Sequence, residues 1–145
     1  MDKTDFFELI HNAELLNDRT MTLFMNRFNS NVNISQIIFL SKLKEQGPQK
    51  STVLAKSLGF TAGAITGITN KLVKDGLIYR LNQEDDRRVR LISITDAGIE
   101  LLNKAQVEGQ NMRNEVYSAL NEEESKQLLQ IQKKLLDHVQ KLKSE

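Results

Sequence analysis

The sequence predicts a mainly α-helical fold with a small β-hairpin, and three observations lead to this prediction. Apolar residues recur at helical spacing over most of the 145 residues. The period changes from helical to two after Gly76, and the two period-two segments are separated by a run of polar and charged residues, 82–88. At this length we expect one domain, or one domain with a helical extension, and a chain of this size can bury about two-thirds of its unfolded surface.

Two helices are predicted in the first third of the chain. Residues 5–28 contain neither proline nor glycine, and their apolar side chains recur at helical spacing until Asn29-Ser30-Asn31. A second helix is expected to begin near Ser35, a good N-cap residue, and to end at Gln46-Gly47-Pro48.

Two shorter helices follow, joined by a tight connection. Ser51 is expected to cap a helix over 52–58, and Thr61 a helix that runs to Asp75, with Gly76 as a left-handed terminator. Only Gly59 and Phe60 separate the two helices, as helix-turn-helix geometry requires.

A hairpin and two more helices complete the chain. Residues 77–81 and 89–94 read as strands, and the polar run 82–88 reads as a solvated hairpin tip. Thr95-Asp96 is expected to cap a helix over 96–119, and Asn121 with Glu124 a helix over 122–143. The sequence therefore predicts a winged helix-turn-helix lobe, residues 34–99, with a helical dimerisation region formed by 1–33 and 100–145.

The fourth predicted helix has an outer face of small and polar residues. That face, with the capping residue, comprises Thr61, Ala62, Gly63, Thr66, Gly67, Asn70, Lys71 and Lys74. Each of the two glycines costs roughly 1 kcal/mol relative to alanine, so stability alone gives little reason for them. We interpret the face as one that enters a DNA major groove, where Thr66 and Asn70 contact bases or phosphates and the lysines contact phosphates. The alternative is close packing of another protein's helix.

The hairpin tip supplies a second candidate contact with DNA. Asp86 can orient the Arg88 guanidinium, with Arg87 beside it, toward the negative potential of a narrow minor groove. The alternative is a solvated turn with incidental charges. Helix N-termini add candidate phosphate anchors at Ser35, Gln36, Ser51 and Thr52, although capping explains Ser35 and Ser51 equally well.

Composition bounds the other functions. The chain has no cysteine, which excludes disulfides and thiolate zinc sites, and its two histidines, His11 and His138, are too far apart for a local metal motif. We expect no metal, no cofactor and no enzymatic activity, because the acidic clusters lack a nearby histidine or nucleophile motif. With no apolar run near ~20 residues and no signal-peptide pattern, we expect a cytoplasmic protein without a membrane partner. Residues 34–100 hold ten Lys and Arg against seven Asp and Glu, so charge alone does not indicate a polyanion partner.

The lobe resembles the DNA-binding lobe of the MarR family of bacterial transcriptional regulators. The resemblance lies in STVLAKSLGFTAGAITGITNKLVKDGLIYR and DDRRVRLISITDAG, and the family's wing pattern maps to Asp86, Arg88, Ile94, Thr95 and Gly98. It implies a homodimer that binds pseudo-palindromic promoter DNA as a double strand, usually represses transcription, and is released by a small, often phenolic or amphipathic effector. Many members carry arginine where this chain has Gly67, so the resemblance implies that Thr66, the backbone at Ala62 and the wing contribute more to DNA binding.

The terminal helices fit a dimer on physical grounds. They carry more large apolar residues than a small lobe can cover, and such helices usually bury them against a partner; the alternative is an intramolecular bundle. An effector cleft between the helical and winged regions would be lined by His11, Phe24, Phe28 and Phe39, although phenylalanines are more often core residues. The alternative function is a winged-helix module that binds protein and not DNA.

Overall fold

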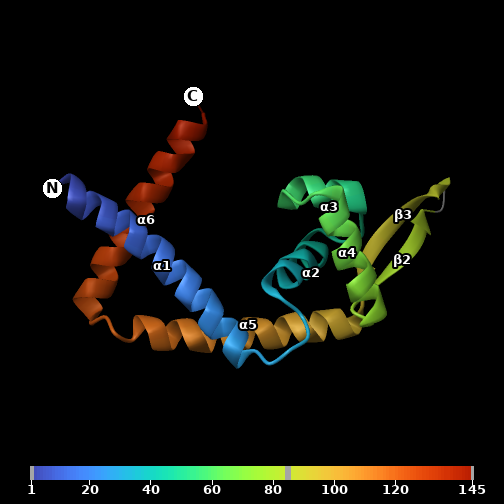
Figure 1. Ribbon diagram of the computed structural model, residues 1–145, viewed down its shortest axis with the longest axis horizontal. Coiled ribbons are helices and arrows are strands. Elements are labelled where there is room, and N and C mark those ends of the chain that lie inside the picture. Colours follow the sequence, from blue (N-terminus) through green and yellow to red (C-terminus); the bar gives the residue numbers. More distant parts are fainter. Residues whose placement is uncertain (1, 84–85, 145) are drawn as a thin grey trace. The chain divides into compact units, whose positions relative to one another are not determined.

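The computed structural model describes residues 2–83 and 86–144, without the side chains of 83–89. Its elements are α1 (Lys3–Arg27), α2 (Ile34–Gln46), β1 (Gln49–Lys50), α3 (Ser51–Leu58), α4 (Ala62–Lys74), β2 (Ile78–Gln83), β3 (Asp86–Ile94), α5 (Asp96–Tyr117) and α6 (Glu122–Lys143) (Figure 1). The predicted mainly α-helical fold with a β-hairpin is confirmed. The chain forms two compact units, Met1–Gly109 and Gln110–Glu145.

Three predicted helix caps are confirmed, among them Thr95 at the start of α5, which accepts from the Gly98 N–H, and two are wrong. Thr61 caps α4 by accepting a hydrogen bond from the Ala64 N–H at 3.1 Å, and Asn121 forms the predicted capping box with Glu124. Ser35 does not cap α2, because the cap lies nearer the start of the sequence, at Asn33. Ser51 does not cap α3 but is its first residue.

Local chemistry explains both corrections. Asn33 Oδ1 accepts from the Gln36 N–H at 2.9 Å while Gln36 Oε1 accepts from the Asn33 N–H at 3.0 Å. This capping box satisfies two N–H groups, whereas a serine cap satisfies one. At α3, Lys50 occupies the N-cap position without a side-chain cap, since its backbone is held extended by strand pairing with Leu91.

The sheet has three antiparallel strands in the order β1-β3-β2. Gln49 pairs with Ile92, and the hairpin pairs from Ile78 with Ile94 outward, with a register shift between Asn82 and Gln83. The predicted tip over 82–88 is too long, because β2 continues to Gln83 and β3 begins at Asp86, and residues 84–85 between them lie outside the described residues. Backbone pairing needs no apolar side chains, so the polar residues of this stretch did not mark the ends of the strands.

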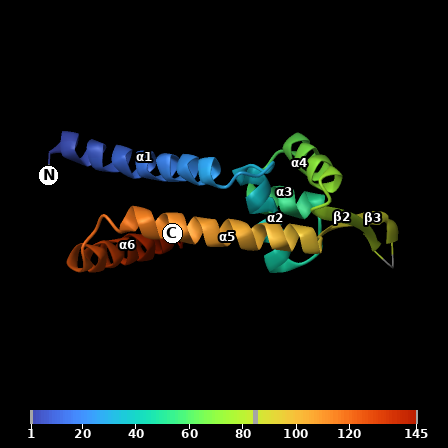
Figure 2. The ribbon, with the colours of Figure 1, turned by 90° about the horizontal axis from the view of Figure 1, so that it is seen from below.

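The core of the first unit lies between α2, α3, α4 and the sheet. Phe39, Leu40, Leu54 and Leu72 are completely buried, and they form one cluster with buried residues of the helices, the strands and the connections between them: Val32, Leu43, Ile65, Leu77, Ile78, Ile92 and Leu102. This cluster fixes the position of α4 against the sheet, and Figures 1 and 2 show the β2–β3 ribbon beside α4.

A compact junction joins the end of α4 to the start of α5. Thr95 Oγ1 donates to the Gly76 carbonyl at 2.7 Å and accepts from the Gly98 N–H at 3.1 Å. Gly76 has a φ of +73°, which glycine adopts without a steric penalty. A Cβ on Gly98 would lie 2.4 Å from the Leu77 carbonyl oxygen, so only glycine lets α5 approach this closely.

The second unit contains the end of α5 and all of α6, and α6 buries no residue. Its large apolar side chains are at least half exposed at six positions: Leu129, Ile131, Leu135, Leu136, Val139 and Leu142. Among the described residues, no helix is long and apolar enough to cross a lipid bilayer.

Candidate nucleic-acid interface

Helix α4 presents the small outer face that the sequence predicts. Its opposite side buries Ile65, Thr69 and Leu72, while the outward positions are exposed: Thr61, Ala62, Gly63, Thr66, Gly67, Asn70 and Lys74. A Cβ on Gly63 or Gly67 would meet no atom within 4 Å. Neither glycine is therefore needed for packing among the described residues, and the bare face is free to approach another molecule.

The two polar side chains of this face have defined hydrogen-bonding states. Thr66 Oγ1 donates to the Ala62 carbonyl at 2.9 Å, so its hydroxyl hydrogen is already used and its lone pairs remain. Asn70 Oδ1 accepts from Arg80 Nη2 at 2.7 Å. Both side chains are exposed, so whatever docks on α4 meets these groups.

Lys71 lies in a different position from the one that the outer-face prediction implied. Its ammonium donates to the Asn31 carbonyl and to Gln36 Oε1, the latter at 3.3 Å, and lies 3.6 Å from an Asp75 carboxylate oxygen. These contacts draw the side chain toward the connection between α1 and α2. Gln36, a predicted phosphate anchor, is buried and already bonded to Asn33 and Lys71. A phosphate role for either residue would require these bonds to break.

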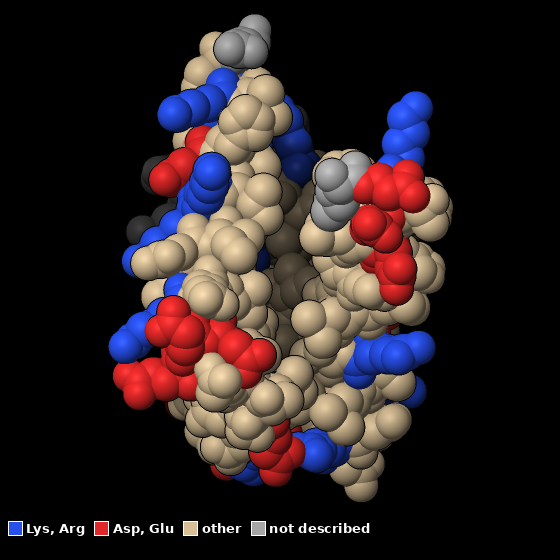
Figure 3. Space-filling model, turned by 90° about the vertical axis from the view of Figure 1, so that its left-hand side faces the viewer, with Lys and Arg blue, Asp and Glu red and all other residues tan. Residues whose placement is uncertain are grey.

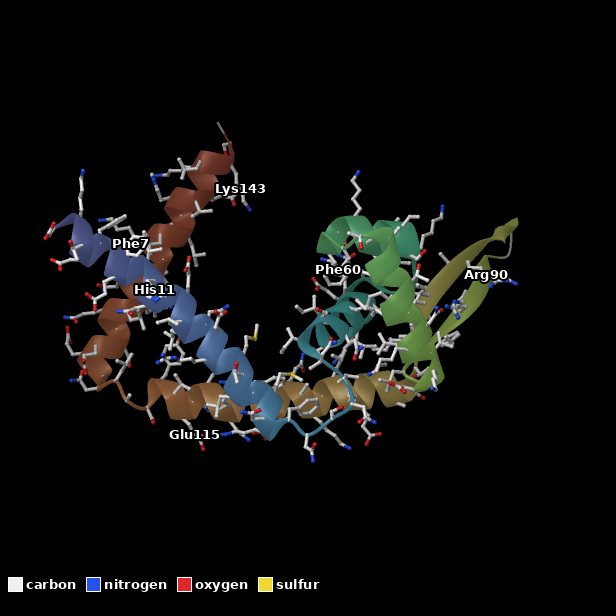
Figure 4. The ribbon with its side chains drawn as sticks, in the orientation of Figure 1. Phe7, His11, Phe60, Arg90, Glu115 and Lys143 are labelled. Carbon is white, nitrogen blue, oxygen red and sulfur yellow. The ribbon has the colours of Figure 1, made fainter. Side chains whose placement is uncertain are left out.

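A pocket of about 160 Å³ opens between α4, the start of α3 and the sheet. It is lined by Ser51, Ile65, Thr66, Thr69, Arg80, Arg90 and Ile92. Arg80 and Arg90 were not among the predicted site residues, although strand alternation places Arg90 on the face of Ile92 and pairs Arg80 with Ile92. Figure 4 shows Arg90 on the ribbon beside α4. The pocket therefore joins two guanidinium groups to the edge of the outer face.

The remaining residues predicted to contact DNA differ in exposure, and the side chains of three of them are not described. Ser35 is partly buried in the first turn of α2, and Thr52 is exposed in the first turn of α3. The backbones of Asp86, Arg87 and Arg88 begin β3, but their side chains lie outside the described residues. The wing's contact with DNA thus stays a prediction from the sequence.

The four residues predicted for an effector cleft do not form one group, because His11 lies apart from the phenylalanines. Phe24 and Phe28 stack with ring centroids 5.3 Å apart, and Phe39 is buried in the core. His11 is exposed on the same helix as Phe24 (Figure 4), thirteen residues or about 20 Å along its axis. The phenylalanines therefore pack the lobe, and His11 lies apart from them.

Basic and acidic residues are nearly balanced in number, and the one face in Figure 3 carries both. The chain has 20 basic and 19 acidic residues, and the face in Figure 3 shows both signs interspersed among uncharged side chains. Within the described part of the chain, no group of three or more histidine, aspartate and glutamate residues is placed to hold a metal ion. The specific arrangement around α4 is thus more informative than the overall field.

Comparison with known proteins gives a consistent result. Residues 32–89 match the family model of the MarR family. The HTH-type transcriptional regulator YpoP of Bacillus subtilis is 31% identical over 99 residues, which cover 66% of this chain and 70% of YpoP. The transcriptional repressor MprA of Escherichia coli is 28% identical, covering 77% of this chain and 66% of MprA. The structure of a mutant MarR from E. coli complexed with operator DNA has the same fold, with a TM-score of 0.71 at 23% identity, and the match covers 94% of this chain and 99% of that one.

Proposed function

Because the chain belongs to the MarR family of transcriptional regulators, whose members bind DNA and are not enzymes, we propose that it is a DNA-binding repressor. In this proposal it binds pseudo-palindromic promoter DNA as a homodimer and is released by a small-molecule effector.

One observation carries the proposal for DNA. The outer face of α4 is free of side-chain bulk at Gly63 and Gly67, which pack against nothing among the described residues. Arg80 and Arg90 lie at the edge of the same face. A backbone that can approach closely, beside guanidinium groups, suits a major groove bordered by phosphates. A mutant MarR from E. coli with the same fold forms a complex with operator DNA, which supports DNA as the partner.

Dimerisation is supported by the exposed apolar side chains of the terminal helices. In α1 they are Phe6, Phe7, Leu9, Ile10, Leu16 and Met21, and α6 adds the six named above. We therefore assign residues 1–33 and 100–145 to a dimerisation region and 34–99 to the DNA-binding lobe. A two-fold dimer can place two copies of α4 about 34 Å apart, one turn of B-DNA.

Release by an effector is supported by the pocket beside α4. Two arginine side chains at its lining favour a small organic anion, and such a ligand would disturb groups on the DNA-facing side. Benzoate is a suitable probe. It should weaken duplex binding by the wild type, and Arg90→Met should reduce that effect. Equal inhibition of both proteins would place the effector elsewhere.

The second candidate is a protein-interaction module, because an exposed glycine face also accepts a helix from another protein. A salt titration distinguishes the two. For the repressor, the logarithm of duplex affinity falls linearly with the logarithm of salt concentration, with a slope of about −0.9 for each phosphate neutralised. Replacing Arg88 or Lys74 with alanine should weaken duplex binding. A duplex affinity that does not change with salt concentration or with either alanine substitution would contradict the proposal.

A further inference from the structure

We propose that Arg80 is a positioning residue that makes Asn70 a hydrogen-bond donor to DNA, so that α4 selects guanine at one position of each half-site. This inference rests on the proposed DNA-binding function and goes further, because it names the base and the residue that sets the preference.

The contact between the two side chains fixes the orientation of the Asn70 amide. Arg80 Nη2 lies 2.7 Å from Asn70 Oδ1. A guanidinium group has donors but no acceptor, so it can only face the oxygen of the amide. The Asn70 Nδ2 group, with its two hydrogens, is therefore directed away from Arg80.

The two side chains of this hydrogen bond belong to elements that pack on the same core. Arg80 is paired with Ile92 within the β2–β3 ladder, and Ile92 belongs to the buried core. Asn70 belongs to α4, whose inner face contributes Ile65 and Leu72 to that core. Both ends of the hydrogen bond are thus held by packed elements, and the amide is oriented before DNA arrives.

An amide held in this way favours one base edge over another. Bidentate recognition of adenine requires Oδ1 to accept from N6 while Nδ2 donates to N7. In this protein a cation already occupies Oδ1 and opposes the approach of a second donor. Guanine presents two acceptors, O6 and N7, in the major groove, and the free Nδ2 hydrogens of Asn70 match them.

The rest of the outer face allows a short side chain to reach the base. Gly67 lies one turn before Asn70, and Gly63 one turn before Gly67; neither adds a side chain that would hold the helix away from the groove. Thr66 has already used its hydroxyl hydrogen on the Ala62 carbonyl, so it offers only acceptors. Asn70 lies one turn after Thr66 and offers the donors that Thr66 lacks.

The experiment starts from the half-site that the full-length protein selects from a random duplex pool. Each guanine of the half-site is replaced by adenine, and separately by 7-deazaguanine, which lacks N7. The wild type should prefer guanine over both replacements at one position by about tenfold. Asn70→Asp, which keeps the acceptor for Arg80 but loses both donors, should abolish that preference, and so should Arg80→Met.

Arg90→Met is the matched control, because it removes the same charge from the neighbouring strand without touching the Asn70 contact. It should weaken binding to every sequence and retain the guanine preference. A merely structural or phosphate-binding role of Arg80 would likewise reduce affinity uniformly and leave the preference intact. Retention of the preference in Arg80→Met or in Asn70→Asp, or a wild-type preference for adenine at the position sensitive to Asn70, would overturn the proposal.

Failure of this inference differs from failure of the proposed function. If no duplex sequence is enriched at all, the DNA-binding function itself fails. If a sequence is enriched but none of its guanines depends on Asn70, DNA binding stands and the role given to Arg80 is refuted.

Discussion

The winged lobe and helix α6 differ in how far their apolar residues are buried. In the lobe, Phe39, Leu40, Leu54 and Leu72 are completely buried, whereas α6 has no buried residue. Both segments carry apolar stripes at helical spacing, so the difference does not lie in their periodicity. It lies in whether the chain itself supplies a surface to cover the stripe.

The contrast assigns different tasks to the two regions. A lobe whose core is closed can hold α4 and the ribbon in a fixed geometry. Most of a helix's stability in a protein comes from packing of its apolar face, and the six exposed large apolar side chains of α6 need a cover. We therefore infer that the lobe recognises DNA and that α6 joins two chains. Each of the following substitutions tests one of these two roles.

Leu135→Asp should have the largest effect, because it places a charge within the apolar stripe of α6. In a two-fold dimer two leucines are lost, which costs roughly 3–6 kcal/mol and weakens dimerisation at least about a hundredfold. Gln130→Asp changes the charge equally at another exposed position of α6 and should leave the dimer intact. Sedimentation velocity measures both, and a stable Leu135→Asp dimer would remove α6 from the interface.

Leu72→Ala should lower the free energy of unfolding by about 2–5 kcal/mol, because it opens a cavity in the closed core. The volume-conserving Leu72→Met should cost less than about 1.5 kcal/mol. Denaturant unfolding of both variants provides the measurement. If Leu72→Ala and Leu72→Met are equally stable, the lobe core is not packed as described.

Thr95→Val should cost about 1–2 kcal/mol of unfolding free energy, because it removes the cap of α5 and the bond to the Gly76 carbonyl. Thr95→Ser keeps the hydroxyl and should recover most of the loss. Thermal unfolding compares the two variants with the wild type. A valine variant as stable as the serine variant would show that the junction contributes shape without hydrogen bonding.

Lys71→Met should have the smallest effect on DNA binding, because the Lys71 ammonium is engaged by Asn31, Gln36 and Asp75. We expect the salt dependence of duplex affinity to keep its slope. Lys74→Met should reduce the slope by about one, as expected for a lysine that contacts a phosphate. The opposite pattern would mean that Lys71 leaves its intramolecular partners on binding DNA.

Much of the fold was predictable from local patterns in the sequence. Helical periodicity, the cap at Thr61, the terminator at Gly76 and the capping box at Asn121 all involve residues within four positions of one another. The two-residue strand β1 was not predicted, because its pairing with Ile92 joins residues 43 positions apart and leaves no local pattern. The caps predicted at Ser35 and Ser51 are wrong. The capping box at Asn33 sets the start of α2, and the strand pairing of Lys50 sets the start of α3.

The sequence predicts which residues share the exposed face of α4, but not the hydrogen bonds that these residues make to other elements. Periodicity alone placed Thr66, Gly67 and Asn70 on one exposed face. The hydrogen bond from Arg80 to Asn70 depends on how β2 packs beside α4. The inward position of the Lys71 side chain depends on its hydrogen bond to Asn31, in the connection before α2. Thr95 and Gly98, which carried part of the family resemblance, act in the structure as a junction between α4, β2 and α5.

The central claim is that the lobe recognises DNA while the terminal helices pair two lobes, and the stoichiometry on selected DNA tests it most directly. The full-length protein is sedimented with its selected duplex, and with the same duplex lacking one half-site. The account predicts two chains on an inverted repeat with half-site centres about 10 base pairs apart, and a large loss of affinity when one half-site is removed. A single chain per duplex, with full affinity for one half-site, would contradict it.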